Sequence, residues 1–513
     1  MSRDRMRLLA PGILLAVGVA LLCFAYAQAT AAPWPRQRQV RTVVQRTADL
    51  GIDIVRIPPL APAAPSTAAP SVPRPSPAVP APPQPQGHLL RLPVKVGSFG
   101  NAPQRGWLGV EMESLELPLA LSLGLDNANG ALILKTASMG PAALAGLRFG
   151  DIVVGANGAT VTNMNDLRQR VEALAPGTQI ELDVRRVGDG DFVGVLQRLA
   201  DDGNAHVMFR LGKMYATGVG VARDEAEAAR WYRRGADAGN VNATAALAEA
   251  LLEGHGTTVD QQQGVRLLRT AAAREHVGAM YRLAHILLEG KLDAKDPAEA
   301  ARLLTKGAEA RHAPSMVELG RMYTNGIGVP ADARGGATWY RQAAELNYSP
   351  GMVNLGWAYE HGTGIETDLA QAAMWYKRAV ELGNTIGMVD LGLLYAQGRG
   401  VEKNEAMAVA LYRKAANLGN AMAMNNLAWM LQGGKGVERK EPEEAADLML
   451  QALDKGNEFS RQVVTKYANA WSRDFRQALQ RRLRDKGFYS GRIDGEFHAS
   501  TIASLNAYFN RTR

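Results

Sequence analysis

A 36-residue repeat in the second half of the chain constrains its fold more than any other feature of the sequence. A leucine followed by glycine or alanine recurs seven times at this period, and a glycine seven positions later recurs with it. The pairs are Leu211-Gly212, Leu247-Ala248, Leu283-Ala284, Leu319-Gly320, Leu355-Gly356, Leu391-Gly392 and Leu427-Ala428. Self-similarity at such a period is typical of repeat architectures, in which each unit packs only against its neighbours. We count seven repeats between Asn204 and Gly456.

Each repeat is predicted to fold as two helices. In the fourth repeat the apolar and small residues follow the spacing of one helix face. Gly326 should end the first helix, because glycine readily adopts the left-handed conformation of a helix cap. The inward positions are Met316, Leu319, Gly320 and Tyr323 in the first helix and Ala337, Tyr340, Ala343 and Ala344 in the second. One such hairpin cannot bury its apolar face alone, so the units must stack into an α/α solenoid.

Two sequence runs make the repeats resemble Sel1-like repeats, which are related to the tetratricopeptide repeat. One is LG-x-x-Y-x-x-G-x-G-V from Leu319 to Val329, and the other is A-x-x-W-Y-x-x-A, which the fifth repeat carries from Ala372 to Ala379. The second and third repeats depart from the pattern, with Leu-Leu in place of Trp-Tyr. The resemblance implies a curved solenoid that scaffolds protein complexes. The tryptophans are expected to be core residues instead of ligand contacts: Trp231, Trp339 and Trp375.

The region from 105 to 198 resembles a PDZ domain of the type found in periplasmic HtrA proteases. Residues 105–110, Arg-Gly-Trp-Leu-Gly-Val, look like the carboxylate-binding loop of that family, and 138–147, 150–153 and 157–158 match its central turn and strand. Backbone N–H groups of the loop would bind the C-terminal carboxylate of a peptide that adds to the sheet edge. Two helical residues would face the peptide's side chains or, alternatively, only seal the core. The candidate peptide-binding residues are Arg105, Trp107, Leu108, Gly109 and Val110 in the loop and Leu167 and Val171 on the helix.

The stretch from 472 to 513 resembles a small three-helix peptidoglycan-binding domain. The matching positions are Leu479, Leu483, Gly487-Phe488-Tyr489, Gly491, Asp494-Gly495, Phe497 and Thr501, whereas His498 replaces a usual glycine and Tyr508 a usual phenylalanine. The resemblance implies contact with glycan or stem peptide, for which the candidates are Tyr489, Arg492 and Asp494. A basic helix face accompanies them and could favour anionic wall polymers, although such a face is more typically just solvated. It comprises Arg476, Arg481, Arg482, Arg484 and Lys486.

The N-terminus has the pattern of an export signal. Three arginines precede an apolar run at 8–27, and small residues of the A-x-A type follow. The run is also about 20 residues long, which suits an uncleaved inner-membrane anchor. Either reading places the rest of the chain in the periplasm or cell envelope. Cys23, the only cysteine, lies in this run, which leaves no disulfide framework and no cysteine-ligated metal site.

These parts together predict a multidomain, mainly α protein: a small α+β PDZ domain, an α/α solenoid of Sel1-like repeats and a small three-helix module. The predicted ranges are 1–32 for the signal peptide or anchor, 33–104 for a largely disordered linker rich in proline and alanine, 105–198 for the PDZ domain, 204–456 for the repeats and 472–513 for the last module. The proline-rich part of the linker favours an extended spacer.

The sequence lacks the motifs of an enzyme. It contains no G-x-S-x-G run, no Walker sequence and no H-x-x-x-H pair, so no catalytic residue, metal site or cofactor is predicted. A net charge of +8 over 513 residues is too diffuse to indicate nucleic acid. The predicted function is a non-enzymatic envelope scaffold or adaptor that binds protein C-termini through the PDZ domain, a protein partner through the solenoid and peptidoglycan through the last module. The alternatives are a periplasmic regulator or protease adaptor that senses exposed C-termini, and a wall-modifying enzyme, which would need a further domain.

Overall fold

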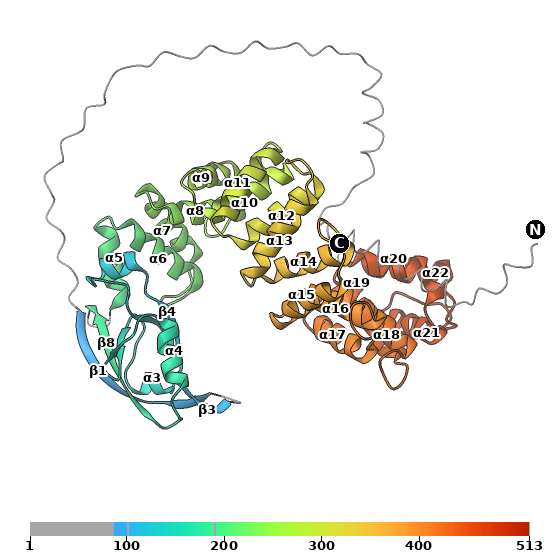
Figure 1. Ribbon diagram of the computed structural model, residues 1–513, viewed down its shortest axis with the longest axis horizontal. Helices are drawn as coiled ribbons and strands as arrows, with labels where there is room; N and C mark the ends of the chain where they lie inside the picture. Colours follow the sequence, from blue (N-terminus) through green and yellow to red (C-terminus); the bar gives the residue numbers. More distant parts are fainter. Residues whose placement is uncertain (1–86, 100–101, 189–190, 512–513) are drawn as a thin grey trace, which may run out of the picture. The chain divides into compact units, whose positions relative to one another are not determined.

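The computed structural model describes residues 87–99, 102–188 and 191–511 (Figure 1). Helices dominate these residues, with a small β-rich domain ahead of them, which confirms the predicted fold class. Two compact units divide the chain, one running to Lys440 and the other beginning at Glu441. In the described ranges no helix is long and apolar enough to cross a bilayer. The predicted export segment, 1–32, and most of the predicted linker lie outside these ranges.

The β-rich domain is built on one antiparallel sheet with the strand order β1-β8-β6-β5-β4, and β7 pairs with β6. Its strands are β1 (Gly87–Lys95), β4 (Val110–Ser114), β5 (Ala131–Thr136), β6 (Ile152–Ala156), β7 (Ala159–Thr160) and β8 (Gln179–Val187), beside a hairpin of β2 (Gly97–Phe99) and β3 (Ala102–Trp107). The helices are α2 (Leu117–Ser122), α3 (Pro141–Leu144), α4 (Met164–Glu172) and α5 (Phe192–Asp201). Because β4 stands at the end of this order, it has strand β5 on one side only.

The first strand of this sheet, β1, lies inside the range predicted as linker, 33–104, which is a correction to that range. β1 pairs with β8 along all nine of its residues. The reason is the alternation of Leu90, Leu92, Val94 and Val96, which the proline-rich composition upstream obscures. Val94 and Val96 are buried in the core of the domain, as period-2 patterning requires.

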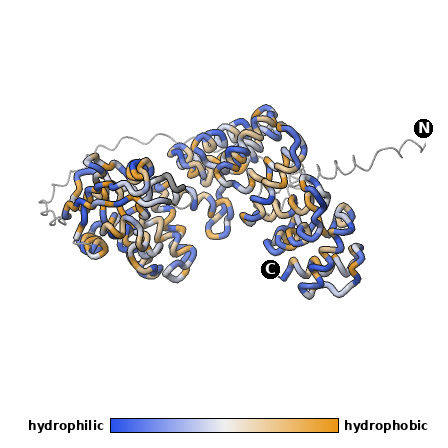
Figure 2. The backbone as a smooth tube through the Cα atoms, turned by 90° about the horizontal axis from the view of Figure 1, so that it is seen from below, coloured by the Kyte–Doolittle hydropathy of each residue, from blue (hydrophilic) through white to orange (hydrophobic). Residues whose placement is uncertain are grey.

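Helices of thirteen residues follow one another through the solenoid, two in each repeat, and α19 of the last repeat is described with the second unit below. They are α6 (Ala205–Thr217), α7 (Glu225–Asp237), α8 (Val241–Glu253), α9 (Gln261–Ala273), α10 (Val277–Glu289), α11 (Pro297–Glu309), α12 (Ala313–Asn325), α13 (Ala333–Glu345), α14 (Ser349–His361), α15 (Leu369–Glu381), α16 (Thr385–Gln397), α17 (Glu405–Asn417) and α18 (Ala421–Gly433). Capping residues set these lengths. Asn204 caps α6 through its side chain, Asp224 caps α7, and Gly218 ends α6 at φ +73°. Figure 2 shows hydrophobic and hydrophilic residues interspersed along the helices, as amphipathic packing requires.

In the repeats that carry a tyrosine in the second helix, its ring packs against the glycine of the Leu-Gly step. A Cβ added at Gly356 would lie 2.6 Å from the ring of Tyr376, so the glycine is what lets the two helices approach. Tyr376 is fully buried, whereas its neighbour Trp375 is only half-buried. Trp231 is 6% exposed and fits the expected core position, but Trp339, like Trp375, lies shallower than its tyrosine.

The second unit contains the last helices of the chain. They are α19 (Pro442–Asp454), α20 (Glu458–Lys466), the short 3-10 helix η3 (Ala468–Ala470), α21 (Arg473–Asp485) and α22 (Ala499–Asn510). Phe475, Leu479 and Leu483 form one buried face of α21, which packs against α19 and α22. Phe488 meets Tyr508 edge-on with 5.2 Å between ring centroids, and this contact closes the core over α22.

Candidate peptide-binding site

The candidate carboxylate loop connects β3 to the edge strand β4. Gly109 has φ +71°, and a Cβ there would lie 3.1 Å from the ring of Trp107. Both the backbone conformation and the lack of space for a side chain therefore favour glycine at this position. The loop carbonyls are fixed on the side facing α3. The N–H of Ala142 donates to the carbonyl of Leu108 at 2.9 Å, and the N–H of Ala137 donates to that of Gly109 at 2.7 Å.

Within the described residues, the carbonyls of the loop are hydrogen-bonded, but two of its N–H groups are not. In the ranges that the structure describes, neither Leu108 N–H nor Gly109 N–H donates a hydrogen bond. Both residues are buried, and buried backbone N–H groups are almost always paired. Two adjacent donors of this kind, one of them in a left-handed residue, have the character of an anion nest. The loop is therefore suited to hold a carboxylate.

The predicted helical residues lie behind this loop. Leu167 and Val171 belong to the same buried cluster as Leu108, and Val110 and Met112 of β4 pack against it. The structure thus brings the predicted loop and helix residues together, but Leu167 and Val171 are 0% and 5% exposed. A ligand side chain would reach them only after their neighbours shift, so their contact with a peptide stays a prediction. The side chain of Arg105 lies outside the described part of the structure.

Polar contacts fix the first turn of α4 beside β4, where Met164 N donates to the hydroxyl of Ser114 at 3.4 Å. The side chain of Asn163 caps α4 by accepting from Asn165 N and Asp166 N. A hydrogen bond from Arg170 and another from the backbone of Thr162 lower the pKa of Asp166 to about 2. The charged carboxylate therefore persists across ordinary pH and keeps the first turn of α4 in place.

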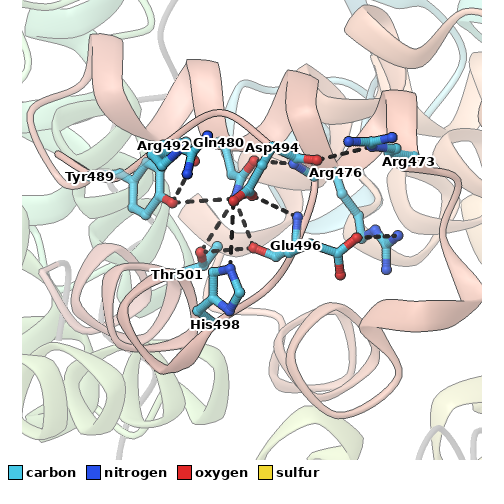
Figure 3. Close-up of polar contacts among 10 residues, drawn as sticks. Arg473, Arg476, Gln480, Tyr489, Arg492, Asp494, Glu496, His498 and Thr501 are labelled. Atoms are coloured by element: carbon cyan, nitrogen blue, oxygen red, sulfur yellow. Dashed lines mark hydrogen bonds and ion pairs between the residues drawn. The ribbon is translucent and has the colours of Figure 1, made fainter.

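The candidate residues of the C-terminal module surround a buried glutamine (Figure 3). Gln480, fully buried on α21, accepts from Gly495 N at 2.8 Å and donates to the carbonyl of Glu496 at 2.9 Å. Tyr489 is 5% exposed, and its hydroxyl donates to the carbonyl of Arg492 at 2.8 Å. These bonds hold the loop 487–498 in one conformation.

Asp494 also stabilises the conformation of this loop. Its carboxylate accepts from Glu496 N at 2.8 Å, and this bond is the main reason why the pKa of Asp494 is lowered. His498 lies 3.5 Å from its other oxygen. Of the three predicted wall-binding residues, Tyr489 and Asp494 therefore support the loop, while Arg492 is exposed on it. Gln480 was not predicted from the sequence, although a polar residue beside Leu479 on the apolar face of α21 indicates a buried polar side chain.

The basic face of α21 is mostly engaged within its own unit. Arg482 Nε lies 2.6 Å from Asp447 Oδ1 on α19, and Arg481 pairs with Glu443. Arg476 is nearly buried and donates to the side chain of Asn469. The expectation of a solvated face is therefore wrong for Arg481 and Arg482, which pair with acidic residues of α19, and for Arg476, which is covered within the module itself. Arg484 and Lys486 remain exposed.

Comparison with family models finds a PDZ domain at 106–195 and a Sel1 repeat seven times, at 205–240, 241–276, 277–312, 313–348, 349–384, 385–420 and 421–457. A probable periplasmic serine endoprotease, DegP-like, of Rhizobium meliloti is 41% identical over 91 residues, 18% of each chain. A protein of the same description from Brucella suis is 37% identical over 102 residues, 20% of this chain and 19% of its own. The chain thus spans about a fifth of the length of these relatives.

Among solved structures, a Sel1 repeat protein from Oxalobacter formigenes is similar at 27% identity and a TM-score of 0.45, over 54% of this chain and 80% of that one. The antigen c5321 of uropathogenic Escherichia coli, which displays an SLR fold, is similar at 23% identity and a TM-score of 0.36. That match covers 63% of this chain and 86% of the antigen.

Proposed function

We propose that this chain, in which a PDZ domain precedes seven Sel1 repeats, is an adaptor that captures the free C-terminus of another protein and holds a second protein on its solenoid. The Sel1 solenoid is a non-catalytic scaffold fold, and the likeness to DegP-like proteases covers the PDZ portion without the protease domain. The observation that carries the proposal is that, among the residues the structure describes, the N–H groups of Leu108 and Gly109 have no hydrogen-bond acceptor.

The terminal carboxylate of a peptide can accept a hydrogen bond from each of these two N–H groups. Hydrogen bonds from N–H groups to a charged acceptor are stronger than neutral ones, so the loop would favour a free chain end over an internal peptide. The residues ahead of that carboxylate would pair with β4, which has a neighbouring strand on one side only. Main-chain pairing then gives affinity, and the wall around Val110 and Met112 favours an apolar last residue.

The test is selection of peptides with free C-termini from a random library by the full chain. Gly109→Ala should abolish selection, because the new Cβ strains a left-handed residue and meets the ring of Trp107. Gly177→Ala is the matched control, since Gly177 also has positive φ but has open space around it. Selection that survives Gly109→Ala, or that enriches no common C-terminal residue, would reject the proposal.

The outcome also separates an adaptor with one partner from a regulator. Enrichment of one defined end sequence supports a fixed scaffold, whereas capture of any apolar end supports a sensor or protease adaptor for damaged proteins. The DegP-like relatives are described as periplasmic, and the predicted export segment leads to the same compartment. We therefore place this activity in the periplasm or cell envelope. A fusion of residues 1–32 to a reporter that is active only outside the cytoplasm tests this placement.

We also propose that the loop 487–498 contacts peptidoglycan through Arg492. Its support is the rigidity that Gln480 gives the loop and the exposure of Arg492 at its surface. The full chain should sediment with insoluble sacculi, and Arg492→Glu should weaken this binding. Arg484→Glu is the control, because it makes the same change of charge at an exposed position of α21, outside the loop. If the unaltered chain stays in solution, wall binding is rejected and the peptide site stands alone.

A further inference from the structure

The PDZ domain and the first repeat share one hydrophobic core. A single buried cluster joins Leu132 of β5, Ile152 of β6, Leu196 of α5 and Leu211 of α6. Phe192, at the start of α5, is buried in the same cluster and meets Phe149 edge-on with 5.6 Å between ring centroids. Packing against buried side chains, instead of a flexible linker, therefore fixes α6 relative to the sheet.

Polar contacts join the far end of the edge strand to the same helix. Glu113 of β4 forms an ion pair with Arg210 of α6, whose side chain is only 8% exposed. One turn earlier, His206 Nε2 lies 3.4 Å from a carboxylate oxygen of Glu116. The cap of α6 takes part as well, because the side-chain amide of Asn204 donates to the hydroxyl of Ser122 at 2.8 Å. The end of β4 and all of α2 are thus held against the first repeat.

A peptide bound at the carboxylate loop would run towards this junction. Its last residue would lie near Leu108 and Gly109, and its upstream residues would follow β4 towards Ser114. A strand advances about 3.4 Å per residue, so the five residues of β4 match about five residues of ligand. Residues further upstream would leave the strand where α2 begins.

The surface at that exit is apolar with an acidic border. Leu117 and Leu121 are 50% and 52% exposed, and their spacing of four residues places them on one face of α2. The opposite face is buried, as Leu119 and Ala120 pack into the shared core. Glu116, at the start of α2, has a side chain that is 59% exposed. Because α2 begins only three residues after the last residue of β4, this surface lies close to the end of the strand, and it complements apolar and basic side chains.

We propose that α2 is an upstream subsite for the same ligand: it receives apolar and basic residues about six to ten positions before the captured carboxylate. The inference rests on the proposed capture of C-termini by the PDZ domain. It assigns α2 and α6 a joint role, in which the solenoid holds the subsite in line with β4. The favoured partner is then a protein whose last ten or so residues are extended, with an apolar end and an apolar-basic stretch ahead of it.

The test compares three synthetic peptides that share the five C-terminal residues selected from the library. One ends there, one carries Lys-Leu-Lys-Leu-Lys upstream, and one carries Gly-Ser-Gly-Ser-Gly. Fluorescence anisotropy with the full chain should show about tenfold tighter binding of the Lys-Leu peptide than of the other two, as expected from partial burial of two leucines. The double substitution Leu117→Ser and Leu121→Ser should remove this gain and leave the affinity of the short peptide unchanged.

Val259→Ser controls for the loss of an exposed apolar side chain, because Val259 is 57% exposed and lies beyond α8 in the second repeat. Glu116→Lys should reduce the gain and reverse any preference for lysine. Equal affinities of the three peptides, or a gain that survives the double substitution, would overturn the upstream subsite while capture of the C-terminus stands. Failure of the short peptide to bind would instead overturn the proposed function itself.

Discussion

Asp390 on α16 is a carboxyl group in a site that disfavours its charge. Burial, and next the charge of Glu360, raise its pKa from 3.8 to about 8. Glu360 accepts hydrogen bonds from Tyr376 and Arg399, each at 2.9 Å, which fixes its carboxylate close to that of Asp390. In the described residues Asp390 has no hydrogen-bond or ion-pair partner of its own. We predict that Asp390→Asn stabilises the protein at alkaline pH.

The sign follows from the direction of the shift. The folded-state pKa lies above the unfolded value, so the folded chain binds the proton more tightly, and stability present below the unfolded pKa is lost as pH rises through the folded one. A pKa unit corresponds to about 1.4 kcal/mol, which gives roughly 6 kcal/mol as an upper limit for a shift from 3.8 to about 8. Asp390 keeps some accessible surface, and water screens its charge, so we expect about 2 kcal/mol.

Urea denaturation and hydrogen exchange of α14–α16 would measure this difference at several pH values between about 4 and 9. The wild type and Asp390→Asn should be equally stable at the acidic end and diverge as pH rises, with the variant more stable. Asp237→Asn, at an exposed position on α7, should follow the wild type throughout. If wild type and Asp390→Asn lose stability in parallel, the site does not disfavour the charge and the reasoning fails.

Three further predictions concern packing and pairing. Gly356→Ala should cost about 1–3 kcal/mol by urea denaturation, because its Cβ would meet the ring of Tyr376, and an unchanged stability would contradict this packing. Gln480→Leu should lower the melting temperature of the C-terminal unit by removing about 2 kcal/mol, since it leaves the buried N–H of Gly495 without its acceptor and removes the bond to the carbonyl of Glu496. A double-mutant cycle of Arg482→Ala and Asp447→Ala should give a coupling of about 1 kcal/mol or less, which about 1 M salt should shrink; a coupling insensitive to salt would argue against an ion pair.

The solenoid was largely predictable because its signals are local and repeat. The spacing of Leu319 and Gly320 from Gly326 defines a helix face and its end, and the structure places Gly326 at φ +66°. What the period could not decide is which aromatic of a pair lies deeper. In the fifth repeat Tyr376 meets Gly356 and lies deeper than Trp375. In the first repeat Tyr232 meets Gly212, yet Trp231 is the more buried of the pair.

The parts that escaped prediction depend on contacts between distant segments. Arg482 and Asp447 are 35 residues apart, and only the docking of α21 on α19 shows that the basic face is paired. Phe192 and Leu196 look like the end of one domain, yet they form the core that the PDZ domain shares with the first repeat. The motif identified the loop at Leu108, but only the structure shows that the N–H groups of Leu108 and Gly109 have no acceptor among the described residues.

The central claim is that the N–H groups of Leu108 and Gly109 bind a terminal carboxylate. The most direct measurement compares the affinity of the full chain for one selected peptide as its free acid and as its C-terminal amide. We predict that the amide binds at least about tenfold more weakly, because it loses the charge-assisted hydrogen bonds. Gly109→Ala should remove this difference, whereas Gly177→Ala should keep it. Equal binding of acid and amide would show that the loop does not recognise a terminal carboxylate.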